Sequence, residues 1–257
     1  MDQSVVPIID MLELRKASRK ELNRLFEALS GIGFVYIKNH GVAEREVSAI
    51  MQSSKIFFSQ SLESKEAIKM SKARQSWRGY FSVGKELTLG KPDWKEGIYF
   101  GREHDEHHPG VINSWPLHGK NLWPANPKLQ DFRNQILDYM KKLEGISGEF
   151  LGYIALCLGL DLEYFVKRFA EPTVLFRIFN YPALVGKETK DLWSVAEHTD
   201  MGFLTVLKQD QSGGLEAKTL DGVWVEVPPV EDTFVINIGD MLELWTGGLL
   251  RATPPQS

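Results

Sequence analysis

The pattern of apolar and polar positions divides the chain into a first part with helical periodicity and a last part with short, closely spaced strands. In the first part, apolar residues recur at the spacing of one helical face. Ser18 and Glu21 have the spacing of a capping box at the start of one such stretch, and Gly159 follows the longest one. The predicted helices cover residues 18–30, 44–58, 127–158 and 161–169.

Runs rich in β-branched and aromatic residues predict the strands. Two of these runs lie among the helices, and the others follow one another closely in the last part of the chain. The predicted strands cover residues 5–10, 33–37, 173–182, 203–208, 215–218, 223–227 and 233–238. Helices followed by closely spaced strands predict an α+β fold whose second half is a sandwich or a barrel.

Residues 71–125 are rich in Gly, Pro, Trp and charge and show no sustained period. Such a stretch predicts either a functional covering loop or several short elements. Three of the six histidines, His104, His107 and His108, lie in its segment at residues 101–110. Because Gly and Pro bound this segment and almost every residue in it is charged or polar, we interpret it as a solvated loop rather than a metal site.

Composition narrows the class of protein. A chain of 257 residues, 43% hydrophobic and 25% charged, is that of an ordinary globular protein with one large domain or two small ones. The net charge of −4 gives no basic surface for nucleic acid or anionic lipid. Cys157 is the only cysteine and lies in an apolar run, so we expect a small buried side chain rather than a reactive thiol. We expect a cytoplasmic monomer that binds neither nucleic acid nor membrane.

One short motif carries candidate chemistry. His198 and Asp200 are two residues apart, so on an extended chain their side chains point the same way and both could hold one ion. An imidazole and a carboxylate, joined by a second His, form the facial triad of non-haem Fe(II) oxygenases. A bare triplet of this kind arises about once by chance in a chain of this composition, and His104-Asp105-Glu106 is a second one. The chain has no P-loop, G-x-G-x-x-G, G-x-S-x-G or H-E-x-x-H motif, which leaves the metal site without a strong rival.

Segments along nearly the whole chain resemble the isopenicillin N synthase-like Fe(II) and 2-oxoglutarate-dependent dioxygenases. Their number and order make the resemblance more specific than any one of them. They are Val6-Pro7-Ile8-Ile9-Asp10, Gly33-Phe34-Val35-Tyr36-Ile37-Lys38-Asn39-His40-Gly41, Arg78-Gly79-Tyr80, Asp93-Trp94-Lys95-Glu96, Asn121-Leu122-Trp123-Pro124, Tyr181-Pro182, His198-Thr199-Asp200-Met201-Gly202, Gly213-Gly214-Leu215 and Asn237-Ile238-Gly239-Asp240.

The resemblance implies a fold and a division of the chain. The family has a double-stranded β-helix, or jelly roll, flanked by helices. Residues 1–170 would form the N-terminal helical region with its strands, and residues 171–257 a partial jelly-roll oxygenase core, together one structural unit.

The resemblance also implies roles for single residues. His198 and Asp200 resemble the first two iron ligands. Tyr181 resembles the tyrosine whose hydroxyl helps to hold the distal carboxylate of 2-oxoglutarate. The alternative is that it is an aromatic side chain that faces the sandwich. Asn237 and Asp240 are expected to form turn and strand hydrogen bonds, and His40 to be a structural histidine.

The implied reaction uses Fe(II), O₂ and 2-oxoglutarate to oxidise an unactivated carbon of a small organic molecule, and releases succinate. A few members of the family use no 2-oxoglutarate. Iron supplies the difficult chemistry, whereas the protein supplies ligand geometry, a dry pocket and substrate placement.

The sequence departs from the family at the third ligand. Pro255 stands where the distal His belongs, and a proline side chain has no donor atom. The later Arg that would bind the 2-oxoglutarate carboxylate is also absent. We therefore expect a C-terminally truncated form of a dioxygenase with an impaired iron site; the alternatives are a non-catalytic jelly-roll protein that binds a ligand or partner, and a metal shell completed by Gln256 or the Ser257 carboxylate. No catalytic residue besides the metal and cosubstrate ligands is predicted.

Overall fold

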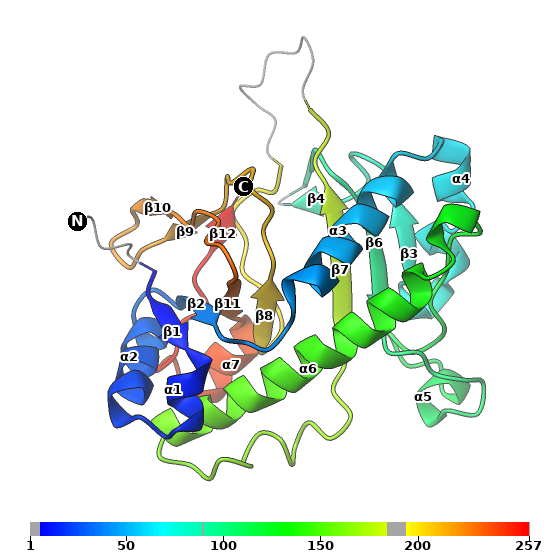
Figure 1. Ribbon diagram of the computed structural model, residues 1–257. Helices are drawn as coiled ribbons and strands as arrows, with labels where there is room; N and C mark the ends of the chain where they lie inside the picture. The colour runs from blue at the N-terminus through cyan, green and yellow to red at the C-terminus, as the bar shows by residue number, and fades with distance from the viewer. Residues whose placement is uncertain (1–5, 89, 184–193, 257) are drawn as a thin grey trace. The chain divides into compact units, whose positions relative to one another are not determined.

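The computed structural model describes residues 6–88, 90–183 and 194–256. The chain forms two compact units that do not follow the order of the sequence (Figure 1). Unit 1 is formed by the described residues of Met1–Gly41, Gly145–Ala170 and Ala196–Ser257, and unit 2 by those of Val42–Glu144 and Glu171–Val195.

Unit 1 contains two sheets. The first has the strand order β1-β2-β11-β8, in which β1 and β2 are parallel and the other pairs are antiparallel. Its strands are β1 (Ile8–Asp10), β2 (Phe34–Lys38), β8 (Leu204–Leu207) and β11 (Phe234–Ile238). The second sheet has the order β10-β9-β12 and is antiparallel. Its strands are β9 (Glu216–Lys218), β10 (Trp224–Glu226) and β12 (Pro255–Gln256).

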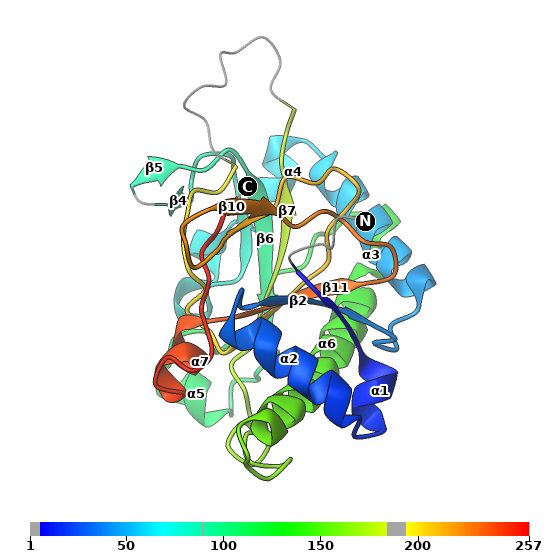
Figure 2. The ribbon, with the colours of Figure 1, turned by 90° about the vertical axis from the view of Figure 1, so that its left-hand side faces the viewer.

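A buried apolar cluster joins the two sheets of unit 1. Phe34 and Tyr36 of β2 and Val235 of β11 pack with Ala217 of β9 and with Val227, which follows β10. Because strand side chains alternate between faces, the other residues of β2 point away from this cluster. Every residue of β2 before its last is nevertheless buried, and helix α2 (Arg19–Ser30) packs on this strand (Figure 2). The middle of the first sheet is therefore covered by the second sheet on one face and by helix α2 on the other.

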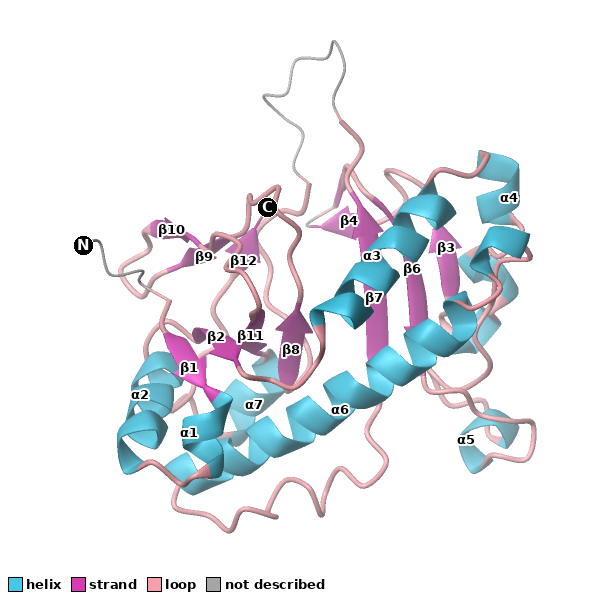
Figure 3. Cartoon of the chain, in the orientation of Figure 1, coloured by secondary structure: helices cyan, strands magenta, loops and turns pink. Residues whose placement is uncertain are grey.

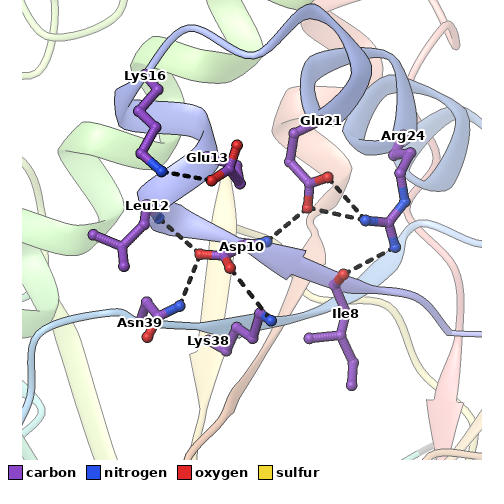
Figure 4. Close-up of polar contacts among 9 residues, drawn as sticks. All are labelled: Ile8, Asp10, Leu12, Glu13, Lys16, Glu21, Arg24, Lys38 and Asn39. Atoms are coloured by element: carbon purple, nitrogen blue, oxygen red, sulfur yellow. Dashed lines mark hydrogen bonds and ion pairs between the residues drawn. The ribbon is translucent and has the colours of Figure 1, made fainter.

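The start of α2 differs from the predicted capping box. The Ser18 hydroxyl accepts a hydrogen bond from the Glu21 amide, as expected. The Glu21 carboxylate, however, accepts from the amide of Asp10 at 2.7 Å and pairs with Arg24 (Figure 4). Asp10 in turn accepts from the Asn39 side chain at 2.8 Å. Glu21 thus ties the helix to β1 instead of closing its own first turn.

Unit 2 is built on the antiparallel sheet β3-β6-β7, formed by Gly79–Phe81, Glu96–Gly101 and Leu175–Asn180 (Figure 3). The central strand, β6, is buried along its whole length. Phe100 of β6 contacts the rings of Phe132 and Phe176. Phe132 begins helix α6 (Phe132–Cys157) and stacks on Phe57 of helix α3 (Glu44–Phe58). Aromatic contacts therefore connect two helices with this sheet.

Shorter elements complete the units. They are α1 (Met11–Arg15), α4 (Leu62–Glu66), η1 (Met70–Lys72), η2 (Arg74–Ser76), β4 (Leu87–Thr88), β5 (Lys91–Pro92), α5 (Pro109–Ile112), η3 (Pro127–Leu129) and α7 (Asp240–Trp245). The stretch at residues 71–125 is therefore a series of short pieces around β3 and β6, one of its two predicted forms. No helix within the described residues has the length and apolarity that a bilayer span requires.

The helix predicted at residues 161–169 is wrong, because this segment forms turns. Its Phe165 is fully buried and makes edge-on ring contacts with Phe203 and Trp245, while Phe169 contacts Phe203. These contacts with distant residues override the local helical preference of the segment.

Candidate metal centre

His198 and Asp200 come together in the irregular segment that precedes β8, rather than on the extended chain that the sequence suggested. The Nε2 atom of His198 lies 3.7 Å from Oδ1 of Asp200. The other ring nitrogen, Nδ1, lies 2.9 Å from the carbonyl oxygen of Ala196. Since a carbonyl only accepts, Nδ1 carries a proton, so in the neutral ring the lone pair is on Nε2, the atom that lies near the carboxylate.

The second oxygen of Asp200 is held from two sides. Oδ2 accepts hydrogen bonds from the Thr205 hydroxyl of β8 and from the Asn237 amide of β11, the latter at 2.8 Å. Asn237 is only 3% exposed, so its amide has a fixed position. Each donor residue therefore has one atom anchored by the protein and one atom directed at the other donor.

A close backbone approach fixes the segment that carries the pair. The Asp240 amide donates to the Asp200 carbonyl at 2.7 Å, and the Met241 amide donates to the Gly202 carbonyl at 3.2 Å. A Cβ atom on Gly239 would lie 2.2 Å from that Gly202 oxygen, so only glycine allows the approach. These bonds match the structural role predicted for Asn237 and Asp240.

The backbone of Pro255 contacts the backbone of His198. Its carbonyl oxygen accepts a hydrogen bond from the His198 amide at 3.3 Å, and it pairs with Ala217 in the ladder between β12 and β9. The neighbouring Gln256 side chain donates to Glu216 at 2.7 Å. Gln256 is therefore engaged elsewhere, and Ser257, the other residue considered for the metal shell, lies outside the described residues.

The residues fit two of the three protein ligands of an iron site. A nitrogen and an oxygen bound at right angles to one ion, each at about 2.1 Å, would be about 3 Å apart. The observed 3.7 Å therefore needs only a small closure. Within residues 6–88, 90–183 and 194–256, no third His, Cys, Asp or Glu joins them in a group that could hold a metal.

The other predicted site residues have different surroundings. Tyr181 follows β7 in unit 2, is 45% exposed and contacts the ring of Phe179, and its role at the cosubstrate stays a prediction. His40 packs edge-on against Phe234, with ring centroids 4.4 Å apart, and burial lowers its pKa. Burial raises the pKa of the Cys157 thiol to about 11. The surroundings of His40 agree with its expected structural role, whereas Cys157 is half-buried rather than buried, and its thiol donates to the Leu22 carbonyl at 3.3 Å.

A second group of histidines lies in unit 2. His104, His108 and His118 each place a ring nitrogen within 4.8 Å of the others. The predicted solvated loop holds for Glu106 and His107, which are exposed, but it is wrong for His104 and His108, which are half-buried. The sequence did not indicate His118, because it lies ten residues after His108 and only the turn after α5 brings it back.

Two family models match the chain. The model described as non-haem dioxygenase in morphine synthesis N-terminal matches residues 6–126, and that of the 2OG-Fe(II) oxygenase superfamily matches residues 173–255. A protein of Dictyostelium discoideum named "Probable iron/ascorbate oxidoreductase" is 40% identical over 274 residues, which cover 97% of this chain and 75% of that protein. The chain belongs to the 2OG-Fe(II) oxygenase superfamily.

Further relatives of this oxygenase agree with the assignment. Homoarginine-6-hydroxylase of Glycine max is 32% identical over 269 residues, which cover 98% of this chain and 80% of that enzyme. The crystal structure of a full-length Neurospora crassa protein in complex with alpha-KG has a TM-score of 0.86 and 25% identity, covering 100% of this chain and 82% of that one. These matches confirm the predicted α+β jelly-roll fold and the family's use of Fe(II), 2-oxoglutarate and O₂ on small molecules.

Proposed function

We propose that this 2OG-Fe(II) oxygenase binds Fe(II) through Nε2 of His198 and Oδ1 of Asp200. The observation that supports the proposal is the 3.7 Å approach of these two atoms while the remaining polar atom of each side chain is held by a neighbour. An imidazole and a carboxylate are the donor types of the facial-triad iron oxygenases. The described segment therefore presents a nitrogen and an oxygen to one ion.

Three neighbours keep this pair ready for the metal. The Ala196 carbonyl fixes the tautomer of His198, whereas Thr205 and Asn237 fix the rotation of the Asp200 carboxylate. Bound iron, together with 2-oxoglutarate, would supply the activation of O₂ for oxidation of a small organic molecule. Tyr181 would donate its hydroxyl to the distal carboxylate of the cosubstrate. The protein would act as a cytoplasmic monomer.

The third protein ligand is missing at Pro255, which weakens the hold on iron. Losing a residue that only orients a ligand typically costs roughly 10- to 100-fold in metal affinity or activity, and losing a ligand should cost more. We therefore propose that this form of the oxygenase has an impaired iron site. The impairment comes from one side chain, because the backbone of Pro255 already contacts His198.

The test compares Fe(II) binding, under anaerobic conditions, by the natural chain and by Pro255→His. If the new imidazole completes the triad, Fe(II) should bind at least about 10-fold more tightly. Gln256→His, one position along the same strand, is the matched control and should show no such gain. Equal affinity of Pro255→His and the natural chain would refute the assignment of residue 255. If neither chain bound Fe(II), the proposed function itself would fail. Succinate formation from 2-oxoglutarate, measured on both, reports turnover.

A further inference from the structure

The three histidine rings of unit 2 form a compact group of nitrogen donors. His104 lies on the segment after β6, His108 is the N-cap residue of α5, and His118 follows that helix. The centroid of the His104 ring is 4.3 Å from that of His108 and 4.7 Å from that of His118. The ring of Trp115 packs edge-on against the ring of His118.

The hydrogen bonds of the rings show which nitrogens are available. Nδ1 of His118 lies 2.9 Å from the Pro116 carbonyl, so it carries the proton and leaves the Nε2 lone pair free to bind. Nδ1 of His104 is buried and has no hydrogen-bond partner among the described residues. A buried polar atom without a partner is rare in folded proteins and calls for an unseen partner. Simple ring packing would explain the stacking but leaves this atom unsatisfied.

His108 differs because its Nδ1 accepts a hydrogen bond from the Gly110 amide at 3.0 Å. A metal at Nδ1 would take the lone pair that this bond uses. A metal at Nε2 would instead require the proton of the neutral ring to move to Nδ1. In both cases His108 must release the Gly110 amide, which gives metal binding a local signature in the backbone.

We propose that His104, His108 and His118 form a second metal site, which binds Zn(II) through three imidazoles. Three-histidine zinc sites leave the fourth position of the tetrahedron open to water or another small ligand. At a zinc–nitrogen distance of about 2.1 Å the donors would be about 3.4 Å apart, so the rings must close from their present separation. The set contains no carboxylate, which favours zinc over the hard cations magnesium and calcium.

The test uses the full chain carrying His198→Ala, so that the pair in unit 1 no longer contributes. The metal-free protein is titrated with Zn(II), and the bound metal is counted by elemental analysis after gel filtration. One equivalent should remain bound, and Co(II) in place of zinc should give the visible absorption of a tetrahedral site. The Gly110 amide resonance should shift on zinc addition, because His108 releases it. Retention of no zinc, or zinc binding without movement of this resonance, would overturn the proposal.

Variants in the same background identify the ligands. His118→Ala and His104→Ala should each lower Zn(II) affinity by at least about 10-fold. His107→Ala is the matched control, because its exposed ring comes from the same segment, and it should bind as the parent does. If His118→Ala does not fold, His118→Gln, which keeps a polar side chain of similar length, takes its place. Equal zinc affinity of the His118 and His107 variants would refute the three-histidine site.

Discussion

The two groups of metal donors place their atoms in opposite ways. In unit 1 two candidate donors meet among the described residues, and hydrogen bonds fix both of them: His198 donates to the Ala196 carbonyl, and Asp200 accepts from Thr205 and Asn237. In unit 2 three imidazoles meet, yet His104 lacks a partner for its buried nitrogen within the described part of the chain. The comparison teaches that a high number of donors and their preorganisation are separate properties. The sequence motif indicated the pair in unit 1, but it indicated neither the neighbours that fix this pair nor the third histidine of the group in unit 2.

The largest effect expected is the loss of iron binding in His198→Ala. The imidazole supplies one of only two donors, so Fe(II) affinity should fall by more than about 100-fold, beyond the range for residues that only orient a ligand. His107→Ala should leave Fe(II) affinity unchanged. Both affinities are measured by anaerobic titration. Equal losses in the two variants would show that the pair in unit 1 is not the iron site.

A smaller effect should follow removal of an amide that only positions the carboxylate. Asn237→Leu keeps the branched shape of the side chain but leaves Oδ2 of Asp200 with one donor fewer, so Fe(II) affinity should fall roughly 10- to 100-fold. In unit 2, Asn180 likewise donates from a strand to a carboxylate, that of Glu96, at 2.9 Å. Asn180→Leu is thus the matched control.

Unfolding free energies of the two asparagine variants separate positioning from general destabilisation. Both variants remove one part-buried hydrogen bond, and each should lose about 1–3 kcal/mol of stability because an acceptor is left with fewer partners. Only Asn237→Leu should also weaken iron binding. A parallel loss of iron affinity in Asn180→Leu would contradict the positioning role of Asn237.

The smallest effect concerns His40, whose ring packs against Phe234 and whose Nε2 lies 3.2 Å from the carbonyl oxygen and 3.7 Å from Oδ1 of Asp232. Burial lowers its pKa, so the unfolded chain takes up the proton more readily, and stability should fall as the pH drops below about 6.5. His40→Phe keeps a ring against Phe234 and should flatten this slope, by at most about 1.4 kcal/mol per pH unit. Urea unfolding between pH 8 and pH 5 measures it. An unchanged slope would show that His40 does not titrate on unfolding.

Local patterns predicted much of the fold. The strands β2, β8 and β11 and the helices α2, α3 and α6 lie where the sequence pattern placed them. The helices have an apolar face at helical spacing, whereas the strands were indicated by their β-branched and aromatic residues, and those of β11 are buried throughout. The prediction failed where distant contacts decide. Strand β6 has a buried glutamate and two glycines, which no strand pattern favours, and Glu96 is stabilised there by Lys65 at 2.7 Å. The turns around Phe165 depend on Phe203 in the same way.

The candidate site was predictable only in its donors. His198 and Asp200 follow from their spacing and their surroundings in the sequence. The Thr205 contact needs the register of β8 beside β11, and the position of His118 needs the turn after α5, neither of which a single sequence provides. The hydrogen bond between Asn237 and Asp200 joins residues 37 positions apart. The sequence motif could therefore indicate that Asn237 forms a hydrogen bond, but it could not indicate the partner.

The contact between His198 and residue 255 uses main-chain atoms alone. Any amino acid at this position can keep that carbonyl in place, whereas only some bring a donor side chain. Under the proposed function, one codon at position 255 would change how strongly the oxygenase retains the metal, while the ladder between β12 and β9 stays intact. In that case the side chain at position 255 would tune the metal affinity of the site without changing the backbone contacts that hold the fold.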